Sequence, residues 1–157
     1  MDISVYKIRP EARLPYRVHP SDAGMDVFYC PDTEKQNSCI WENGEFRIPP
    51  GENCLIPTGL KIEVPEWHML EVKNKSGIAS KRQLLVGACV VDPGYTGELY
   101  VNLHNIGRAT QVIPPGHKIA QIILVPIVAC GVQQIYRDIA DKETSRGSGG
   151  FGSTGEY

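Results

Sequence analysis

The sequence has no excess of positive charge and no long hydrophobic run. It carries 16 Lys and Arg residues against 18 Asp and Glu residues, a formal net charge of −2. Broad binding to nucleic acid or to an anionic membrane surface needs a basic surplus, so both are excluded, although a local basic cluster could bind a small anion. The longest apolar stretch, residues 122–130, is too short for a membrane span and is broken by Pro126. We therefore expect neither a nucleic-acid partner nor a membrane partner.

Closely spaced cysteine pairs are lacking as well. The five cysteines form no C-x-x-C pair and have no histidines at zinc spacing: Cys30, Cys39, Cys54, Cys89 and Cys130. This pattern favours reduced intracellular thiols over a disulfide framework or a structural zinc site. The N-terminal MDISVYKIRP also lacks the pattern of a secretory signal. We expect a cytoplasmic protein, or one inside a host cell if the source is viral.

What the sequence does contain is a series of short extended segments separated by Gly and Pro. The 157 residues suffice for one ordinary core, and a hydrophobic content of 41% with 22% charged residues is typical of a soluble globular domain. Extended segments recur at roughly 8–12 residues, as in a β-sandwich or barrel. Residues 76–83 break this pattern and predict a short helix capped by Ser76. We therefore expect an all-β fold with one short helix.

Residues 84–105 form two β-rich arms joined by a tight turn, which is typical of a β-hairpin. One proline and two glycines set the turn, while Val, Leu and Tyr in the arms favour extended backbone. Asp92 closes the first arm, where an acid is either a turn former that accepts backbone N–H bonds or a general base. The hairpin alone favours the turn former. A turn can nevertheless aim Asp92 and Tyr95 into one pocket, with the ring flat against a sugar.

Two other segments have the composition of phosphate-binding sites. Residues 73–77, Lys-Asn-Lys-Ser-Gly, place two cations and a hydroxyl at the start of the predicted helix, although a solvated basic turn is the commoner explanation of such a pattern. The Gly- and Ser-rich residues 146–157 are not a Walker A sequence, because Ser153 stands where the lysine belongs. They are either a linker or a nucleotide lid, with Arg146 for phosphate and Phe151 for stacking on a base.

Asp26 and Gln121 each leave two interpretations open. Asp26 lies near the start of an extended segment, where a carboxylate commonly bonds to backbone amides of a turn. Gln121 lies within a long β-rich segment, residues 117–128, that we expect to be central. Its amide is either exposed on the alternate face or buried with a polar partner.

Together these segments resemble the five ordered motifs of the homotrimeric dUTP pyrophosphatase (dUTPase) family, over nearly the whole chain. All five occur in order and at sensible spacing, which makes a linker origin of the tail a poor explanation. They are residues 23–27 (AGMDV), 75–79 (KSGIA), 87–98 (GACVVDPGYTGE), 116–122 (GHKIAQI) and 146–155 (RGSGGFGSTG).

This resemblance implies a distorted β jelly-roll subunit over residues 1–145, a flexible C-terminal lid over residues 146–157, and a homotrimer with sites at subunit interfaces. It implies hydrolysis of dUTP to dUMP and pyrophosphate with Mg²⁺, which limits uracil incorporation into DNA and supplies dUMP for dTMP synthesis. Asp92 would activate the water that attacks the α-phosphorus. No protein group would ligate the ion directly, and Asp26 would act at most through water.

The resemblance also implies the substrate contacts. Tyr95 would pack under the deoxyribose, and the backbone around Cys89 and Tyr100 would read uracil through its N–H and C=O groups. Phosphates would be held by Lys75, Ser76, Gly77 and Gln121. The tail of a neighbouring subunit would close over the site with Arg146 on phosphate, Phe151 on uracil, and Gly152, Ser153 and Thr154 around the γ-phosphate.

Three positions depart from the family pattern. Lys75, preceded by Asn74, stands where an arginine preceded by proline is usual, so the charge is kept and the planar two-pronged fork is lost. Met25 replaces a commoner tyrosine or leucine, which changes packing. Cys89 replaces a frequent glycine, and its side chain narrows the base pocket if it points inward.

Two other functions compete with dUTP hydrolysis. A related deaminase would act on dCTP, and a non-catalytic relative would only bind a nucleotide. The Asp92-Pro93-Gly94-Tyr95 bend and the aromatic tail favour the pyrophosphatase over the deaminase. A sensor needs no general base, so Asp92 argues against the binding protein.

Overall fold

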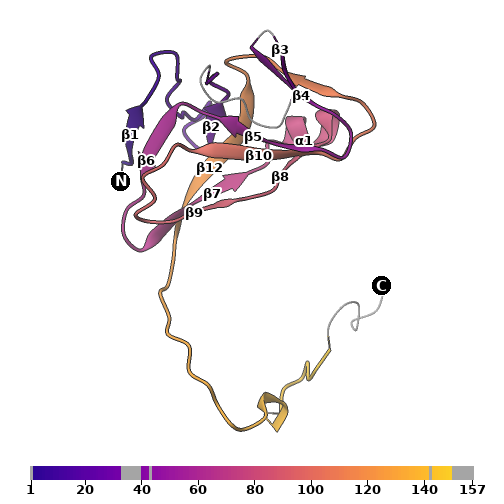
Figure 1. The fold of residues 1–157 in the computed structure, drawn as a ribbon. Coiled ribbons are helices and arrows are strands. Elements are labelled where there is room, and N and C mark those ends of the chain that lie inside the picture. The colour runs from indigo at the N-terminus through magenta and orange to yellow at the C-terminus, as the bar shows by residue number, and fades with distance from the viewer. Residues whose placement is uncertain (1, 33–39, 43, 142, 150–157) are drawn as a thin grey trace.

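The computed structural model describes residues 2–32, 40–42, 44–141 and 143–149, and within them the chain folds as four small β-sheets with one short α-helix (Figure 1). The strands are β1 (Ser4–Lys7), β2 (Met25–Phe28), β3 (Ile40–Glu42), β4 (Glu45–Ile48), β5 (Asn53–Pro57), β6 (Leu60–Glu63), β7 (His68–Lys73), β8 (Leu84–Val86), β9 (Val90–Val91), β10 (Tyr100–Asn105), β11 (Gln111–Ile113) and β12 (Lys118–Pro126). The helices are α1 (Ser76–Arg82) and the 3₁₀ turn η1 (Ile139–Asp141). The expected all-β class with one short α-helix is therefore confirmed. The described strands close no single barrel.

The sheets have the orders β1-β6, β5-β10-β8, β11-β4-β3 and β2-β12-β7-β9, and every pairing is antiparallel. The long strand β12 is central in its sheet, between β2 and β7, as the sequence predicts. Alternation along β10 buries Val101, Leu103 and Asn105 and leaves the intervening residues half-buried. This period of two is what a strand with one face on a core requires.

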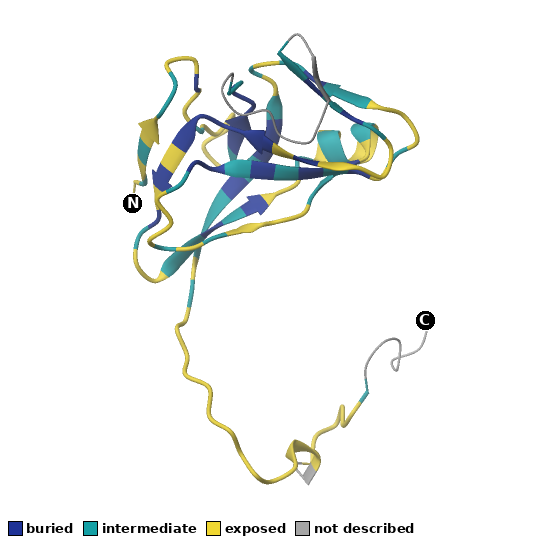
Figure 2. Cartoon of the chain, viewed as in Figure 1, coloured by how far each residue is buried: buried dark blue, intermediate teal, exposed yellow. Residues whose placement is uncertain are grey.

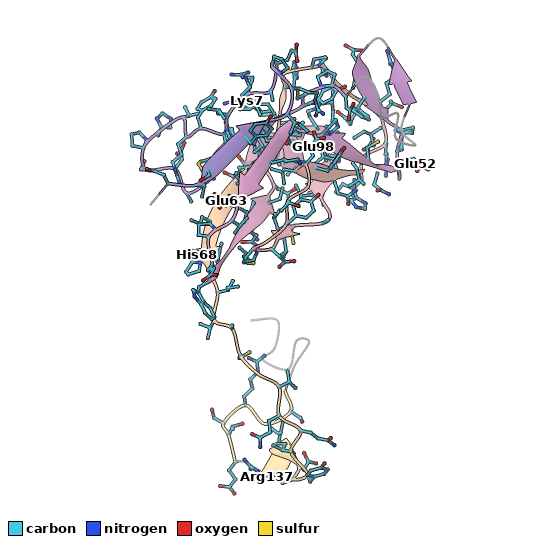
Figure 3. All side chains as sticks on the ribbon, turned by 60° about the vertical axis from the view of Figure 1, so that its left-hand side comes forward. Lys7, Glu52, Glu63, His68, Glu98 and Arg137 are labelled. Carbon is cyan, nitrogen blue, oxygen red and sulfur yellow. The ribbon has the colours of Figure 1, made fainter. Side chains whose placement is uncertain are left out.

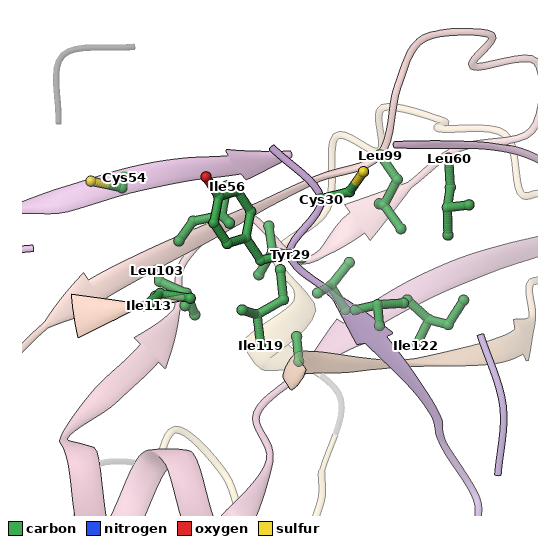
Figure 4. Packing of buried hydrophobic residues seen from close by; sticks show 14 of the residues in the cluster. Tyr29, Cys30, Cys54, Ile56, Leu60, Leu99, Leu103, Ile113, Ile119 and Ile122 are labelled. Carbon is green, nitrogen blue, oxygen red and sulfur yellow. The ribbon is translucent and has the colours of Figure 1, made fainter. Parts of the chain in front are cut away.

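One hydrophobic core joins the four sheets. Most of its residues lie on the buried stretches of the strands, and Tyr29 is among aliphatic side chains such as Ile56 and Leu103 (Figures 2 and 4). The rings of Tyr29 and Phe46 meet edge to face at 5.1 Å. Leu103 from β10 and Ile122 from β12 are both fully buried in it, so two different sheets pack on the same interior. At about 25 cal/mol per Å² of apolar surface, such burial is the main stabilising contribution.

The N-cap of the helix lies one residue earlier than expected. Lys75 is the N-cap, with extended φ and ψ, and it makes no side-chain capping bond; Ser76 is already helical. The prediction of Ser76 as the cap is therefore wrong. The Lys75 side chain is instead drawn to the carboxylate of Asp26, as described below.

Beyond Pro126 the chain leaves the sheets and runs away from them as an extended arm (Figures 1 and 2). Its apolar side chains are exposed, Val132 fully and Val128 by 90%. Cys54 is disulfide-bonded, which corrects the expectation of thiols throughout, whereas Cys30, Cys89 and Cys130 are free. No described helix has the length and apolar character of a membrane span.

Candidate active site

A cavity of about 180 Å³ opens where the two arms of residues 84–105 part. Near their open end the arms pair, with Val86 opposite Leu103, and the Gly87 N–H donates to the Asn102 carbonyl at 2.9 Å. Nearer the turn, β9 leaves to pair with β7 and β10 pairs with β5. The expected simple hairpin is therefore wrong at its tip. The cavity lies between the separated strands and is lined by Val72, Ala88, Val90, Val91, Asp92, Tyr95, Glu98, Leu99 and Tyr100.

Asp92 borders this cavity directly after β9, and its side chain is exposed. Its backbone carbonyl accepts a hydrogen bond from the Tyr95 N–H at 3.3 Å, so the main chain closes the turn. Within the described residues, the carboxylate itself accepts no hydrogen bond and forms no ion pair. The side chain therefore does not hold the bend, and its oxygens are available to a ligand or a water.

Tyr95 stands between two cavities. It borders the small one and also a hollow of about 600 Å³ between β1, β6 and the turn. Its hydroxyl donates to the Glu98 carbonyl at 2.9 Å. A Cβ at Gly97 would lie 2.5 Å from the ring's Cζ, so the glycine makes room for the ring. Asp92 and Tyr95 thus meet at one cavity, as the sequence suggests.

Tyr100 and Cys89 occupy different sides of the strands. The half-buried Tyr100 lines the cavity, where burial and the neighbouring Glu98 carboxylate raise the pKa of its phenol to about 12. Cys89 has an exposed thiol and does not line the cavity, so its side chain does not narrow the pocket. Its carbonyl accepts a hydrogen bond from the Val72 N–H at 2.7 Å, which fixes the backbone beside the cavity.

A second cluster forms around Asp26, whose side chain is only 5% exposed. The carboxylate is paired with Lys118 at 2.7 Å and with Lys75. Burial alone would raise the pKa of Asp26, but the hydrogen bonds from Lys118 and Lys75 outweigh it and hold that pKa below its ordinary value. The same bond raises the pKa of Lys118. Asp26 is therefore an ion-pair centre rather than a turn carboxylate.

Gln121 joins the same cluster from β12. Its Cα is paired with that of Asp26, and its Nε2 donates to the Asn74 carbonyl at 2.9 Å. A Cβ at Gly24 would lie 2.2 Å from the Gln121 Oε1, so the glycine admits the amide. Gln121 is thus a half-buried amide with a polar partner. The segments 23–27, 73–77 and 116–122 converge here.

The start of α1 lies beside this cluster. Ser76 and Gly77 are exposed, and a Cβ at Gly77 would meet nothing within 4 Å. Neither residue is packed against other parts of this chain, so an anion could approach their backbone amides. The two lysines nearby supply the local positive charge that such an approach requires.

Asp92 and the Asp26 cluster lie at opposite ends of β7, although the cavity that Asp92 borders extends along the strand to Val72. Val91 is paired with Leu70, so Asp92 continues past it toward Met69, whereas Gln121 is paired with Lys73. Four residues of extended strand separate Met69 from Lys73, about 13 Å at 3.3 Å per residue. One chain therefore does not bring these two sets of side chains together.

The tail is described only in part. Arg146 donates from Nε to its neighbour Gly149 at 3.0 Å, and it is exposed at the far end of the arm. Phe151, Gly152, Ser153 and Thr154 lie outside the described residues. Their assignment to the nucleotide stays a prediction.

Sequence reasoning missed Lys118 and Glu98. Residues three apart on a regular strand face opposite sides, so Lys118 would not be expected to act with Gln121. A register shift between Lys118 and Ala120 breaks that alternation. Glu98 ends the third segment, yet its carboxylate is buried, and the sequence offers no local signal for this because its partner Arg9 lies 89 residues upstream.

The model of the dUTPase family matches residues 40–155. The chain is 38% identical to the deoxyuridine 5'-triphosphate nucleotidohydrolase of Gloeothece citriformis, over 99% of this chain and 97% of the relative. It is 37% identical to that of Clostridium kluyveri, over 99% of both chains.

Two solved structures share the fold. The Staphylococcus bacteriophage 80alpha dUTPase with dUpNHpp superimposes with a TM-score of 0.82 at 25% identity, over 98% of both chains. The dUTPase of phage phi11 of S. aureus, in a mutant form described with a structural Mg(II) ion, gives 0.74 at 24% identity, over 88% of this chain and 99% of that one.

Proposed function

This chain belongs to the dUTPase family, and on that premise we propose that it hydrolyses dUTP to dUMP and pyrophosphate. The reaction limits uracil incorporation into DNA and supplies dUMP for dTMP synthesis. The observation that carries the proposal is the cavity between the parted arms, bordered by the Asp92 carboxylate, which has no partner among the residues that the structure describes. A general base needs such a carboxylate beside the reacting atom.

Asp92 acts on the attacking water. Its exposed carboxylate accepts a hydrogen bond from the water and takes its proton as the oxygen attacks the α-phosphorus. The bond from the α-phosphorus to the bridging oxygen breaks, and pyrophosphate leaves with that oxygen. The water's oxygen ends in dUMP, and the proton is released to solvent.

The cavity walls position the nucleoside. Tyr95 stacks under the deoxyribose and leaves no room for a 2′-hydroxyl, because its ring is held between its Glu98 bond and Gly97. The backbone at Cys89 and Tyr100 reads uracil. The Cys89 carbonyl is bonded to Val72, so this residue would offer its N–H to the base.

Lys75, Ser76, Gly77 and Gln121 hold the triphosphate. Mg²⁺ bound to the phosphate oxygens would neutralise their charge, and water would complete its coordination. The donor set suits an ion carried by the substrate, because the Asp26 carboxylate is occupied by two lysines. Any contact of Asp26 with the ion would run through water.

The enzyme acts as a homotrimer with sites shared between subunits. The separation of Asp92 from Lys75 along β7 supports this arrangement, because the α-phosphate and the terminal phosphates belong to one substrate. Exposed apolar residues on the arm, Val128 and Val132 among them, support its docking on a neighbour. Arg146, Phe151, Gly152, Ser153 and Thr154 would then close residues 146–157 over that neighbour's site, in the cytoplasm or inside a host cell.

One assay tests the function. Purified protein with Mg²⁺ is given dUTP, UTP, dCTP or dTTP in parallel, and pyrophosphate and ammonia are measured. Pyrophosphate from dUTP, with little from the other three, is expected. Ammonia from dCTP would identify a deaminase, and no product from any nucleotide would identify a binding protein.

A further inference from the structure

Glu98 has a buried carboxylate that neither the water nor the substrate contacts described above use. Its side chain is 6% exposed, and both oxygens accept hydrogen bonds from the guanidinium of Arg9. Its Oε1 also accepts from the Gly59 N–H at 2.7 Å. Figure 3 shows Glu98 within the body of the fold, whereas Arg137 lies far out on the arm.

Arg9 is itself tied to a second segment. It donates to the Cys30 carbonyl at 3.3 Å and pairs with Asp32 at 3.5 Å. Burial would lower the pKa of Arg9, but its bonds to Glu98 and Cys30 outweigh that effect and raise it. Two-pronged arginine–carboxylate pairs fix orientation as well as distance. The pair therefore anchors Glu98, which lines the cavity, to the N-terminal segment.

The anchored residue controls Tyr95 through its backbone. The Tyr95 hydroxyl donates to the carbonyl of Glu98, and Tyr95 borders two cavities. The ring rests against Gly97 and is otherwise next to open space, so the bond to Glu98 is needed to fix its position.

The position of the hydroxyl depends on where the Glu98 carbonyl is held. The Leu99 N–H of the same peptide unit donates to the Leu60 carbonyl at 2.8 Å. Arg9 and the Gly59 N–H hold Glu98 through its side chain.

We propose that Arg9 and Glu98 are positioning residues that set the selectivity of the site for deoxyribose over ribose. The proposal rests on the proposed function, in which Tyr95 lies under the sugar. A shift of the Glu98 carbonyl releases the Tyr95 hydroxyl, the ring swings toward the larger hollow, and a 2′-hydroxyl then fits.

The test compares kcat/KM for dUTP and UTP in wild type, Arg9→Lys, Arg9→Met, and Arg9→Met/Glu98→Gln. Misplacement of a positioning group by about 1 Å can cost up to about 100-fold, so the dUTP-to-UTP ratio should fall at least about tenfold in Arg9→Met. Arg9→Lys keeps the charge without the fork and should restore only part of the ratio. The double variant removes both buried charges and should recover much of the lost melting temperature without recovering the ratio.

Two further variants separate positioning from stability. Ile113→Ala removes a buried side chain in a different sheet, so it should lower the melting temperature and leave the ratio unchanged. Tyr95→Phe removes only the hydroxyl that bonds to the Glu98 carbonyl, and the residue is 47% exposed, so this variant should fold normally and still lose selectivity even if the Arg9 variants do not fold.

Two results would overturn the inference and leave the proposed function standing. One is a dUTP-to-UTP ratio that recovers together with the melting temperature in the double variant. The other is a ratio that stays at the wild-type value in Tyr95→Phe. A wild-type enzyme that turns over UTP as well as dUTP overturns both.

Discussion

At the scale of single residues, the two candidate carboxylates have opposite surroundings. Asp92 is exposed and unpartnered within the described residues, whereas Asp26 is buried between two lysines. A general base needs a carboxylate that is free to receive a proton, whereas the carboxylate of an ion pair is already engaged by its cations. This contrast supports the proposal that Asp92 is the base, with Asp26 as the centre of an ion-pair cluster.

Replacement of Asp92 tests the first assignment. Asp92→Asn should lower kcat by roughly 100-fold or more and leave the affinity for dUTP nearly unchanged, because only proton transfer is lost. Single-turnover kinetics and calorimetric titration of a non-hydrolysable dUTP analogue measure the two effects separately. Full turnover in this variant would remove Asp92 from the mechanism.

The depressed pKa of Asp26 predicts a pH dependence of stability. The folded-state pKa lies below the unfolded value of about 3.9, so the stabilisation is fully present above that value and is lost as pH falls through the folded pKa. The difference in unfolding free energy between wild type and Asp26→Asn should be constant from about pH 5 to 8 and should shrink below about pH 4. Urea denaturation from pH 3 to 8 measures it. Asp22→Asn, at an exposed turn, is the control, and a difference that grows in acid would contradict the ion-pair assignment.

At the scale of elements, periodicity and turn residues predicted strands well. Pro57, Thr58 and Gly59 mark the break between β5 and β6, and the long segment that ends near Val128 is the central β12. The spacing of residues along the sequence could not predict which strands pair with each other. Nothing local shows that β9 pairs with β7 while β10 pairs with β5, because strand pairing depends on contacts distant in sequence. That choice creates the cavity.

The start of the helix and the Arg9–Glu98 pair also depend on contacts between residues that are distant in the sequence. Serine is a common cap, yet Lys75 takes the N-cap position because its side chain has an ion-pair partner 49 residues away in the sequence. Arg9 and Glu98 are separated by 89 residues. Side-chain chemistry indicated which residues could act, and only the fold indicates which of them meet.

The tail gives a prediction for one element. A chain ending at Ser145 should keep the fold, because the last strand of the described sheets ends at Pro126. Its turnover of dUTP should fall by at least about tenfold if the removed segment closes the site. Circular dichroism and sedimentation check that fold and assembly persist. Unchanged kcat after truncation would show that residues 146–157 are no lid.

At the scale of the whole molecule, one chain contains two separate clusters of candidate site residues, one around the cavity and one around Asp26. In the proposed function the cavity receives the nucleoside and the Asp26 cluster receives the phosphates. About 13 Å of β7 separates Asp92, on the border of the cavity, from Gln121 in the cluster. An arm with exposed Val132 leads away from both. Closed rotational symmetry would resolve this by bringing the cavity of one copy to the cluster of the next.

Mixed trimers test that arrangement directly. Asp92→Asn and Lys75→Met each disable a different one of these two clusters, so each homotrimer should have very low activity. When the two variants are unfolded and refolded together, about a quarter of the sites in random trimers should combine an intact Asp92 with an intact Lys75 from another subunit. Activity should therefore return toward about that fraction of the wild-type value. Asp92→Asn refolded with a differently tagged copy of itself should recover nothing. If both residues came from the same chain, no mixture could restore a complete site, so the absence of recovery in trimers shown to be mixed would contradict the shared site.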